Sequence, residues 1–128
     1  MKFISKDLAI KLKEKGFYLP TLEIIGKYDS DGIFHSQLYC NHTETMDCDE
    51  IITPTIEQVI EWLREEKNIF IWMKPYHTYA TKNNICWDWN ISIVNNTHEL
   101  SKYCSDEGFA KYENACIAGI EYVINNLI

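Results

Sequence analysis

The sequence predicts an α+β fold in which an antiparallel sheet of about four strands packs with three helices. Residues 85–93 alternate apolar and polar side chains, as a strand with one buried face does. Residues 56–63 and 116–127 place apolar side chains at the spacing of one helical face. The β-rich segments come in pairs joined by short connections, which favours antiparallel hairpins. We expect the order α-β-β-α-β-β-α in a single domain spanning residues 1–128.

The first helix and the first hairpin occupy residues 1–40. Ser5 is a candidate N-cap, a stripe of Leu8, Ala9 and Leu12 forms the apolar face, and Gly16 provides the stop. The segments "TLEIIGKY" and "GIFHSQLYC" follow, separated by the turn-forming residues 29–32. They predict a β-hairpin.

The second helix follows an acidic segment, residues 41–53, that has no periodicity and predicts a loop. We expect Thr53 to cap this helix and Pro54 to take its first position. The segment "IFIWMKPY", residues 69–76, predicts the next strand and residues 85–93 its hairpin partner. A polar connection then leads to a last helix, "YENACIAGIEYVINNLI". Its small residues, Ala115, Ala118 and Gly119, would let the helix approach the sheet closely.

Composition limits the possible classes of protein. With 128 residues and 46% hydrophobic side chains, the chain can bury a core without a disulfide or a metal. No apolar run is long enough to cross a membrane, and the charged N-terminus lacks the features of a signal peptide, so we expect a cytoplasmic protein without a membrane partner. Five cysteines, an odd number, then indicate reduced thiols.

The charge argues against a nucleic-acid partner. The net charge is −7, although residues 1–15 alone carry five lysines against Asp7 and Glu14. The acidic surplus therefore lies in the rest of the chain, whereas a phosphate-binding surface needs the opposite sign. RNA binding stays an alternative because antiparallel sheets flanked by helices recur in RNA-binding folds, and Phe70, Trp72 and Tyr76 could stack bases.

The sequence offers no metal, cofactor or catalytic site. Cys40, His42 and Cys48 are the nearest approach to a ligand cluster, but they lack the second pair that a zinc site requires, so we expect no metal there. None of the four histidines lies in a catalytic motif, and no glycine-rich phosphate loop is present. These absences lean against an enzyme, although a small enzyme without a recognisable motif stays an alternative.

Three segments carry a resemblance: "MKFISKDLAIKLKEKGF", "TPTIEQVIEWLREEKNIFI" and "GIEYVINNLI". They resemble a family of small uncharacterised proteins encoded by anaerobic gut bacteria and their phages or prophages. In that family a serine usually precedes the Tyr-Glu pair that opens the last helix, and Lys111 stands there in this chain. The cap should then come from Ser105 or Asp106. The resemblance implies a cytoplasmic protein of a mobile element and implies no activity, ligand or catalytic residue.

One strand predicts an interaction surface. If the helices cover one face of the sheet, Trp87, Trp89 and Ile91 lie beneath them, and Asp88, Asn90 and Ser92 face the other way. The segment "IFIWMKPY" is apolar at both parities, so one set of its side chains must leave the core. We expect Phe70 and Trp72, rimmed by Asp88 and Asn90, to pack against a second copy of the chain or a partner protein, with cover by the chain's own loops as the alternative.

The function that these observations favour is therefore a small acidic protein-binding module, of the interaction or inhibitor kind, from a phage or other mobile element.

Overall fold

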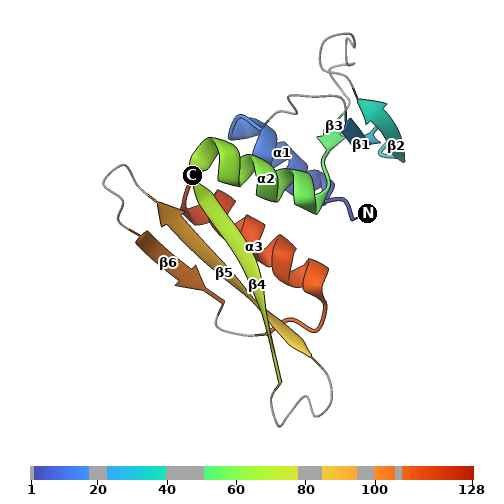
Figure 1. The fold of residues 1–128 in the computed structure, drawn as a ribbon. Helices are drawn as coiled ribbons and strands as arrows, with labels where there is room; N and C mark the ends of the chain where they lie inside the picture. The colour runs from blue at the N-terminus through green and yellow to red at the C-terminus, as the bar shows by residue number, and fades with distance from the viewer. Residues whose placement is uncertain (1, 18–22, 40–50, 78–84, 95–99, 106–107) are drawn as a thin grey trace. The chain divides into compact units, whose positions relative to one another are not determined.

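The computed structural model describes residues 2–17, 23–39, 51–77, 85–94, 100–105 and 108–128. It confirms the α+β class: three helices and two antiparallel sheets lie in these residues (Figure 1). The chain divides into two compact units, Met1–Gln58 and Val59–Ile128. None of the described helices is both long and apolar enough to cross a membrane.

The first unit contains helix α1 (Lys6–Glu14) and a sheet of order β2-β1-β3. Strands β1 (Glu23–Tyr28) and β2 (Phe34–Tyr39) form the predicted hairpin, with Tyr28 opposite Phe34. Strand β3 (Ile51–Thr53) pairs antiparallel with the other edge of β1. These three residues fall within the segment predicted as a loop, because a strand so short shows no period of two.

Helix α1 begins and ends as its sequence predicts. The Ser5 hydroxyl oxygen accepts a hydrogen bond from the Leu8 amide at 3.3 Å. At the other end Gly16 has a φ of +88°, and the amides of Gly16 and Phe17 donate to the carbonyls of Lys13 and Leu12. This pair of bonds is the Schellman arrangement, which requires a left-handed residue after the helix. The expected apolar stripe is buried.

Helix α2 (Ile56–Lys67) begins two residues later than predicted. Thr55, and not Thr53, is its cap: the Gln58 amide donates to the Thr55 hydroxyl oxygen at 3.2 Å, and the Gln58 side-chain oxygen accepts from the Thr55 amide at 2.8 Å. This reciprocal pair needs a glutamine or glutamate three residues after the cap, and Thr53 is followed at that spacing by Ile56. Thr53 instead ends β3.

The second unit contains a sheet of order β4-β5-β6, formed by β4 (Ile69–Tyr76), β5 (Cys86–Val94) and β6 (Leu100–Cys104). Strands β4 and β5 are the predicted hairpin, and β6 lies in the segment predicted as a polar connection. In the described residues each hairpin therefore belongs to its own three-stranded sheet. Each hairpin is joined by a short third strand. The sequence analysis expected instead that the two hairpins would form one sheet of about four strands.

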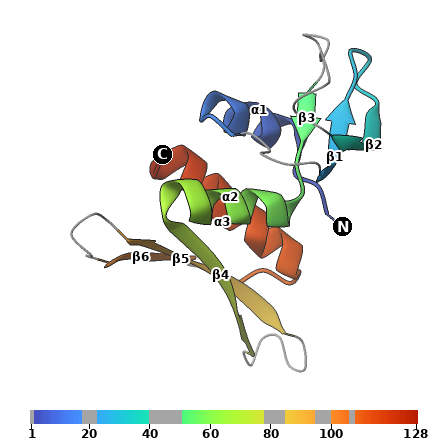
Figure 2. The ribbon, with the colours of Figure 1, turned by 45° about the horizontal axis from the view of Figure 1, so that its top comes forward.

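Helix α3 (Tyr112–Asn126) lies against one face of this second sheet (Figure 2). Its start corrects one expectation, because the N-cap position is Lys111 and no side chain caps it. Ser105 does not serve as the cap: its hydroxyl donates to a carboxylate oxygen of Asp88 at 3.2 Å. Asp106 lies outside the described residues. That α2 covers the same face of the sheet as α3, as the sequence analysis assumed, stays a prediction.

The turn between β1 and β2 is organised by one carboxylate. One oxygen of Asp29 accepts from the amides of Asp31 and Ile33, at 3.0 and 2.9 Å, and the other oxygen lies 3.0 Å from Nε2 of His35. Gly32 supplies a positive φ of +79°. The bond from Ile33, followed by the bond from His35, lowers the pKa of Asp29 below its ordinary value.

The first prediction concerns the end of α1. We expect Gly16→Ala to lower the free energy of unfolding by about 1 kcal/mol, because an L side chain is strained at this φ. Nothing lies within 4 Å of an added Cβ, so the cost comes from the backbone alone. Gly16→Asn is the matched control and should lose less, since asparagine tolerates the left-handed region. Urea unfolding measures both, and equal stability of Gly16→Ala and the wild type would contradict the prediction.

The second prediction concerns acid. Because the pKa of Asp29 is lowered by folding, its carboxylate stabilises the hairpin above the unfolded pKa of about 3.9, and this stabilisation is lost as the pH falls through the folded value. The amide resonances of Asp31 and Ile33 should therefore move together in an NMR titration below about pH 4. In Asp29→Asn, which keeps an acceptor oxygen but cannot titrate, the movement of the Ile33 amide should be absent. If it persists there, another group controls the turn.

Candidate interaction surface

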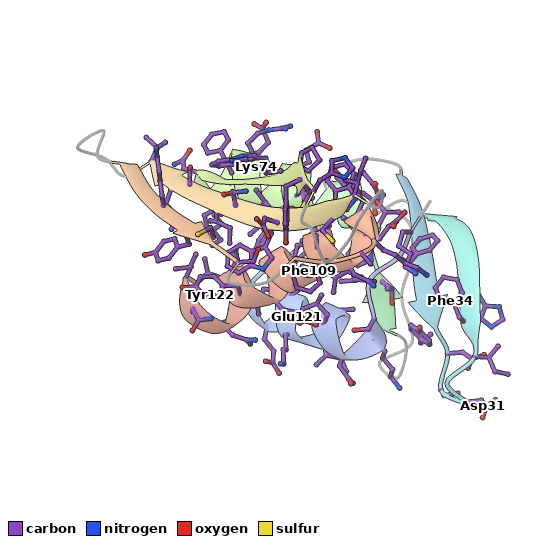
Figure 3. The ribbon with its side chains drawn as sticks, turned by 90° about the horizontal axis from the view of Figure 1, so that it is seen from below. Asp31, Phe34, Lys74, Phe109, Glu121 and Tyr122 are labelled. Carbon is purple, nitrogen blue, oxygen red and sulfur yellow. The ribbon has the colours of Figure 1, made fainter. Side chains whose placement is uncertain are left out.

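The two faces of the β4-β5-β6 sheet differ sharply. Toward α3 lie Ile71, Trp89 and Ile91, with exposed fractions of 9%, 7% and 0%. On the opposite side Phe70 and Trp72 are 39% and 45% exposed. Figure 3 shows Lys74 on this side of the sheet and Tyr122 of α3 on the other. The side chains that alternation directs away from α3 are called the open face: Phe70, Trp72, Lys74, Tyr76, Cys86, Asp88, Asn90, Ser92, Val94, Lys102 and Cys104.

The covered face is held by a close contact between helix and strand. A Cβ added to Gly119 would lie 3.2 Å from Cβ of Trp89 and 3.4 Å from Cγ2 of Ile71. The Tyr122 ring packs on Trp89 with their centroids 4.9 Å apart, and the rings of Tyr112 and Trp87 form a T-shaped pair with centroids 5.1 Å apart. This confirms that the tryptophans of β5 lie beneath a helix.

Register places the polar rim beside the aromatic side chains. Trp72 lies opposite Asn90 in the β4–β5 pairing, and Lys74 lies opposite Asp88. The structure thus brings together Phe70, Trp72, Asp88 and Asn90, as the sequence analysis expected. The backbone holds all four on two adjacent strands.

One end of the open face is closed by a contact that no sequence pattern indicates. The Tyr76 hydroxyl occupies the space that a side chain at Gly108 would need. Phe109 exchanges two backbone hydrogen bonds with Trp87, each 2.8 Å long. It thus pairs with the edge of β5 that also pairs with β6. Desolvation, followed by the charges of Asp88 and Cys86, raises the pKa of Tyr76 above its ordinary value.

The charge of the open face differs from that of the whole chain. Its described charged side chains are Lys74, Lys102 and Asp88, whereas the chain carries −7. The acidic surplus therefore lies elsewhere. Asp88 also has a hydrogen-bond partner, Ser105, so the open face presents aromatic and amide groups more than free carboxylates.

The structure tests other candidate sites in part. Within the described part of the chain, no three His, Cys, Asp or Glu side chains gather as a metal site would require. Cys40, His42 and Cys48 lie outside the described residues. Cys116 is buried, Cys86 is half-buried and Cys104 is exposed.

In comparisons with known proteins, no family model matches the chain, and no curated protein or solved structure is significantly similar to it. The resemblance to proteins of gut bacteria and their phages therefore stays a prediction, and the site must be interpreted from its own geometry.

The third prediction tests the electrostatics at the closed end of the open face. Asp88→Asn removes a negative charge that disfavours the tyrosinate, so the pKa of Tyr76 should fall. The pKa should stay above its ordinary value, because desolvation is the larger cause and remains. A ¹³C NMR titration of labelled tyrosine measures this, with Asp31→Asn as a control of equal charge change in the other unit. Equal shifts in the two variants would show that Asp88 does not act locally.

Proposed function

We propose that the protein is a small protein-binding module and that its open face is the docking surface. The observation that carries this proposal is the exposure of Phe70 and Trp72, which stand two residues apart on the same strand and the same face. Neighbouring exposed aromatic side chains often mark an interaction site, whereas single scattered ones are ordinary.

The geometry suits a binding surface energetically. Interface energy concentrates in a few anchors, and tryptophan is among the residues most enriched at such positions. Both anchors stand on a strand paired along its length with β5, so docking would order little additional backbone. Burying the remaining exposed area of these two side chains would contribute a few kcal/mol at about 25 cal/mol per Å². Asn90 and Lys74 would then form part of a polar rim.

A second candidate function is the binding of single-stranded RNA. It is favoured by one observation, the presence of Lys74 and Lys102 on the same face as two aromatic side chains able to stack bases. The net charge of −7 opposes it, because backbone phosphates are repelled at long range. The chain also contains a single arginine, Arg64, which lies in α2 and outside this face. Protein docking is therefore preferred.

The setting of this module is part of the same proposal. The resemblance of the two chain ends and of α2 to small proteins of gut bacteria and phages supports an origin in a mobile element and action in the cytoplasm. A module of this kind would act by occupying a surface of a host or phage protein, as an interaction partner or inhibitor. No catalytic residue, cofactor or metal is assigned.

The fourth prediction tests the docking surface. For a partner isolated with the wild type, calorimetry should show about 30-fold weaker binding to Trp72→Ser, the loss typical of a central anchor. Ile33→Ser is the matched control: it also removes an exposed apolar side chain, 56% accessible, but in the first unit, and should bind like the wild type. Both variants should unfold within about 0.5 kcal/mol of the wild type, because the removed groups are on the surface.

Two outcomes would overturn protein docking. The first is equal affinity of Trp72→Ser and the wild type for the isolated partner. The second is a salt-dependent complex of the wild type with single-stranded RNA that Trp72→Ser loses, which would establish the RNA-binding candidate instead.

A further inference from the structure

Strand β4 forms one edge of its sheet. The alternation of its hydrogen bonds to β5 shows which of its backbone groups point outward. The Val94 amide donates to the Asn68 carbonyl at 3.3 Å, so even-numbered residues of β4 bond to β5. The backbone groups of Ile69, Ile71, Met73 and Pro75 then point away from the sheet. Within the described residues, no backbone partner is recorded for the outward groups of Ile71 and Met73.

Residues 69–73 of this edge carry none of the charged or proline side chains that usually protect a sheet edge. Exposed edges are commonly guarded by lysine, proline or a bulge, because an unpaired row of amides and carbonyls is a template for another strand. Residues 69–73 are Ile, Phe, Ile, Trp and Met, a run without charge or proline. Lys74 and Pro75, which are residues of the protective kind, follow this run at one end, and Asn68, with a φ of +55°, precedes it at the other.

Accessibility narrows the part of the edge that another strand can reach. Ile69 is 2% exposed, Ile71 is 9% exposed and Met73 is half-buried, so the edge opens toward the end of β4. Pro75 is exposed but has no amide hydrogen to donate. Ile71 and Met73 are therefore the two residues that can offer both a donor and an acceptor.

We propose that β4 pairs antiparallel with β4 of a second copy of the chain, with the two-fold axis at Trp72. In this register Ile71 lies opposite Met73 of the partner subunit, and each outward amide and carbonyl of the pair is satisfied. Moving the axis to Ile71 would set Met73 against the covered Ile69. Moving it to Met73 would set Ile71 against Pro75, which leaves the Ile71 carbonyl without a donor.

The side chains also suit this register. On the open face Trp72 would lie directly opposite Trp72 of the partner subunit, and Phe70 opposite Lys74 of the partner subunit. Cross-strand aromatic pairs and a lysine over a phenyl ring are both favourable at such distances. The two three-stranded sheets would become one sheet of six strands, and the open faces would join. This dimer does not depend on the proposed function, because its hydrogen bonds form at the strand edge and it extends the open face sideways without covering it from above.

The test combines sedimentation with amide hydrogen exchange on the whole chain. Wild-type protein should form a concentration-dependent dimer in the micromolar range. In the dimer the amides of Ile71 and Met73 should be protected, and on dilution they should exchange freely. The amides of Phe70 and Trp72, which bond to β5, should stay protected at both concentrations.

Met73→Pro removes one outward donor from each subunit and should weaken the dimer about 10- to 100-fold. Met73→Ala is the matched control, since it removes the side chain but keeps the amide, and its dimer should resemble that of the wild type. Protection of the Phe70 and Trp72 amides in Met73→Pro reports whether the β4–β5 ladder is intact in that variant.

Two results would overturn the proposal. A monomer at about 1 mM protein would exclude useful edge pairing. A dimer in which the Ile71 and Met73 amides still exchange freely would show association through another surface, and that result needs no proline variant. Neither result bears on binding of a partner by Trp72, which the calorimetric comparison of Trp72→Ser with Ile33→Ser decides separately.

Discussion

The contact between Gly119 and the sheet decides how the second unit is arranged. Because residue 119 has no side chain, the backbone of α3 can lie directly against Trp89 and Ile71. The aromatic rings of Tyr112 and Tyr122 then extend the helix over both tryptophans of β5. One face of the sheet is thereby filled. Every large side chain of opposite parity must lie on the other face, which is the physical reason that Phe70 and Trp72 are exposed.

The same contact fixes which side chains of β4 face the helix. Once Ile69 and Ile71 are buried beneath the helix side of the sheet, a shift of one residue in the β4–β5 register would exchange buried and exposed sets along the whole strand. The register also determines which amides bond to β5 and which point outward. The exposed side chains of the open face and the outward backbone groups of β4 therefore both follow from the packing of α3 on the sheet. A partner would bind the first through side-chain contacts and the second through backbone hydrogen bonds.

Sequence periodicity predicted the parts of this arrangement that depend on local pattern. The period of two in β5 predicted which of its residues lie under a helix, and the double apolar pattern of residues 69–73 predicted that bulky groups would leave the core. The short strands β3 and β6 were missed because pairing with a longer neighbour, and not their own periodicity, makes them strands. The cap of α2 was misplaced because the reciprocal Thr55–Gln58 pair outweighs the preference for proline at the first helical position. The contact of Tyr76 with Gly108 joins residues distant in sequence, so no local pattern announces it.

The two faces of this sheet differ in how much their side chains contribute to folding. Trp89 is 7% exposed and contacts the helix, so truncating it would remove core packing and binding effects could not be separated from unfolding. Trp72 is 45% exposed and pairs with β5 through its backbone, so its indole can be removed while the strand ladder stays intact. The sheet thus keeps its structural tryptophan and its exposed tryptophan on opposite sides. A side chain that contributes little to folding can change under selection for a partner without cost to the fold, and exposed side chains such as Phe70 and Trp72 come nearer to that condition than Asp88, which is bonded to Ser105.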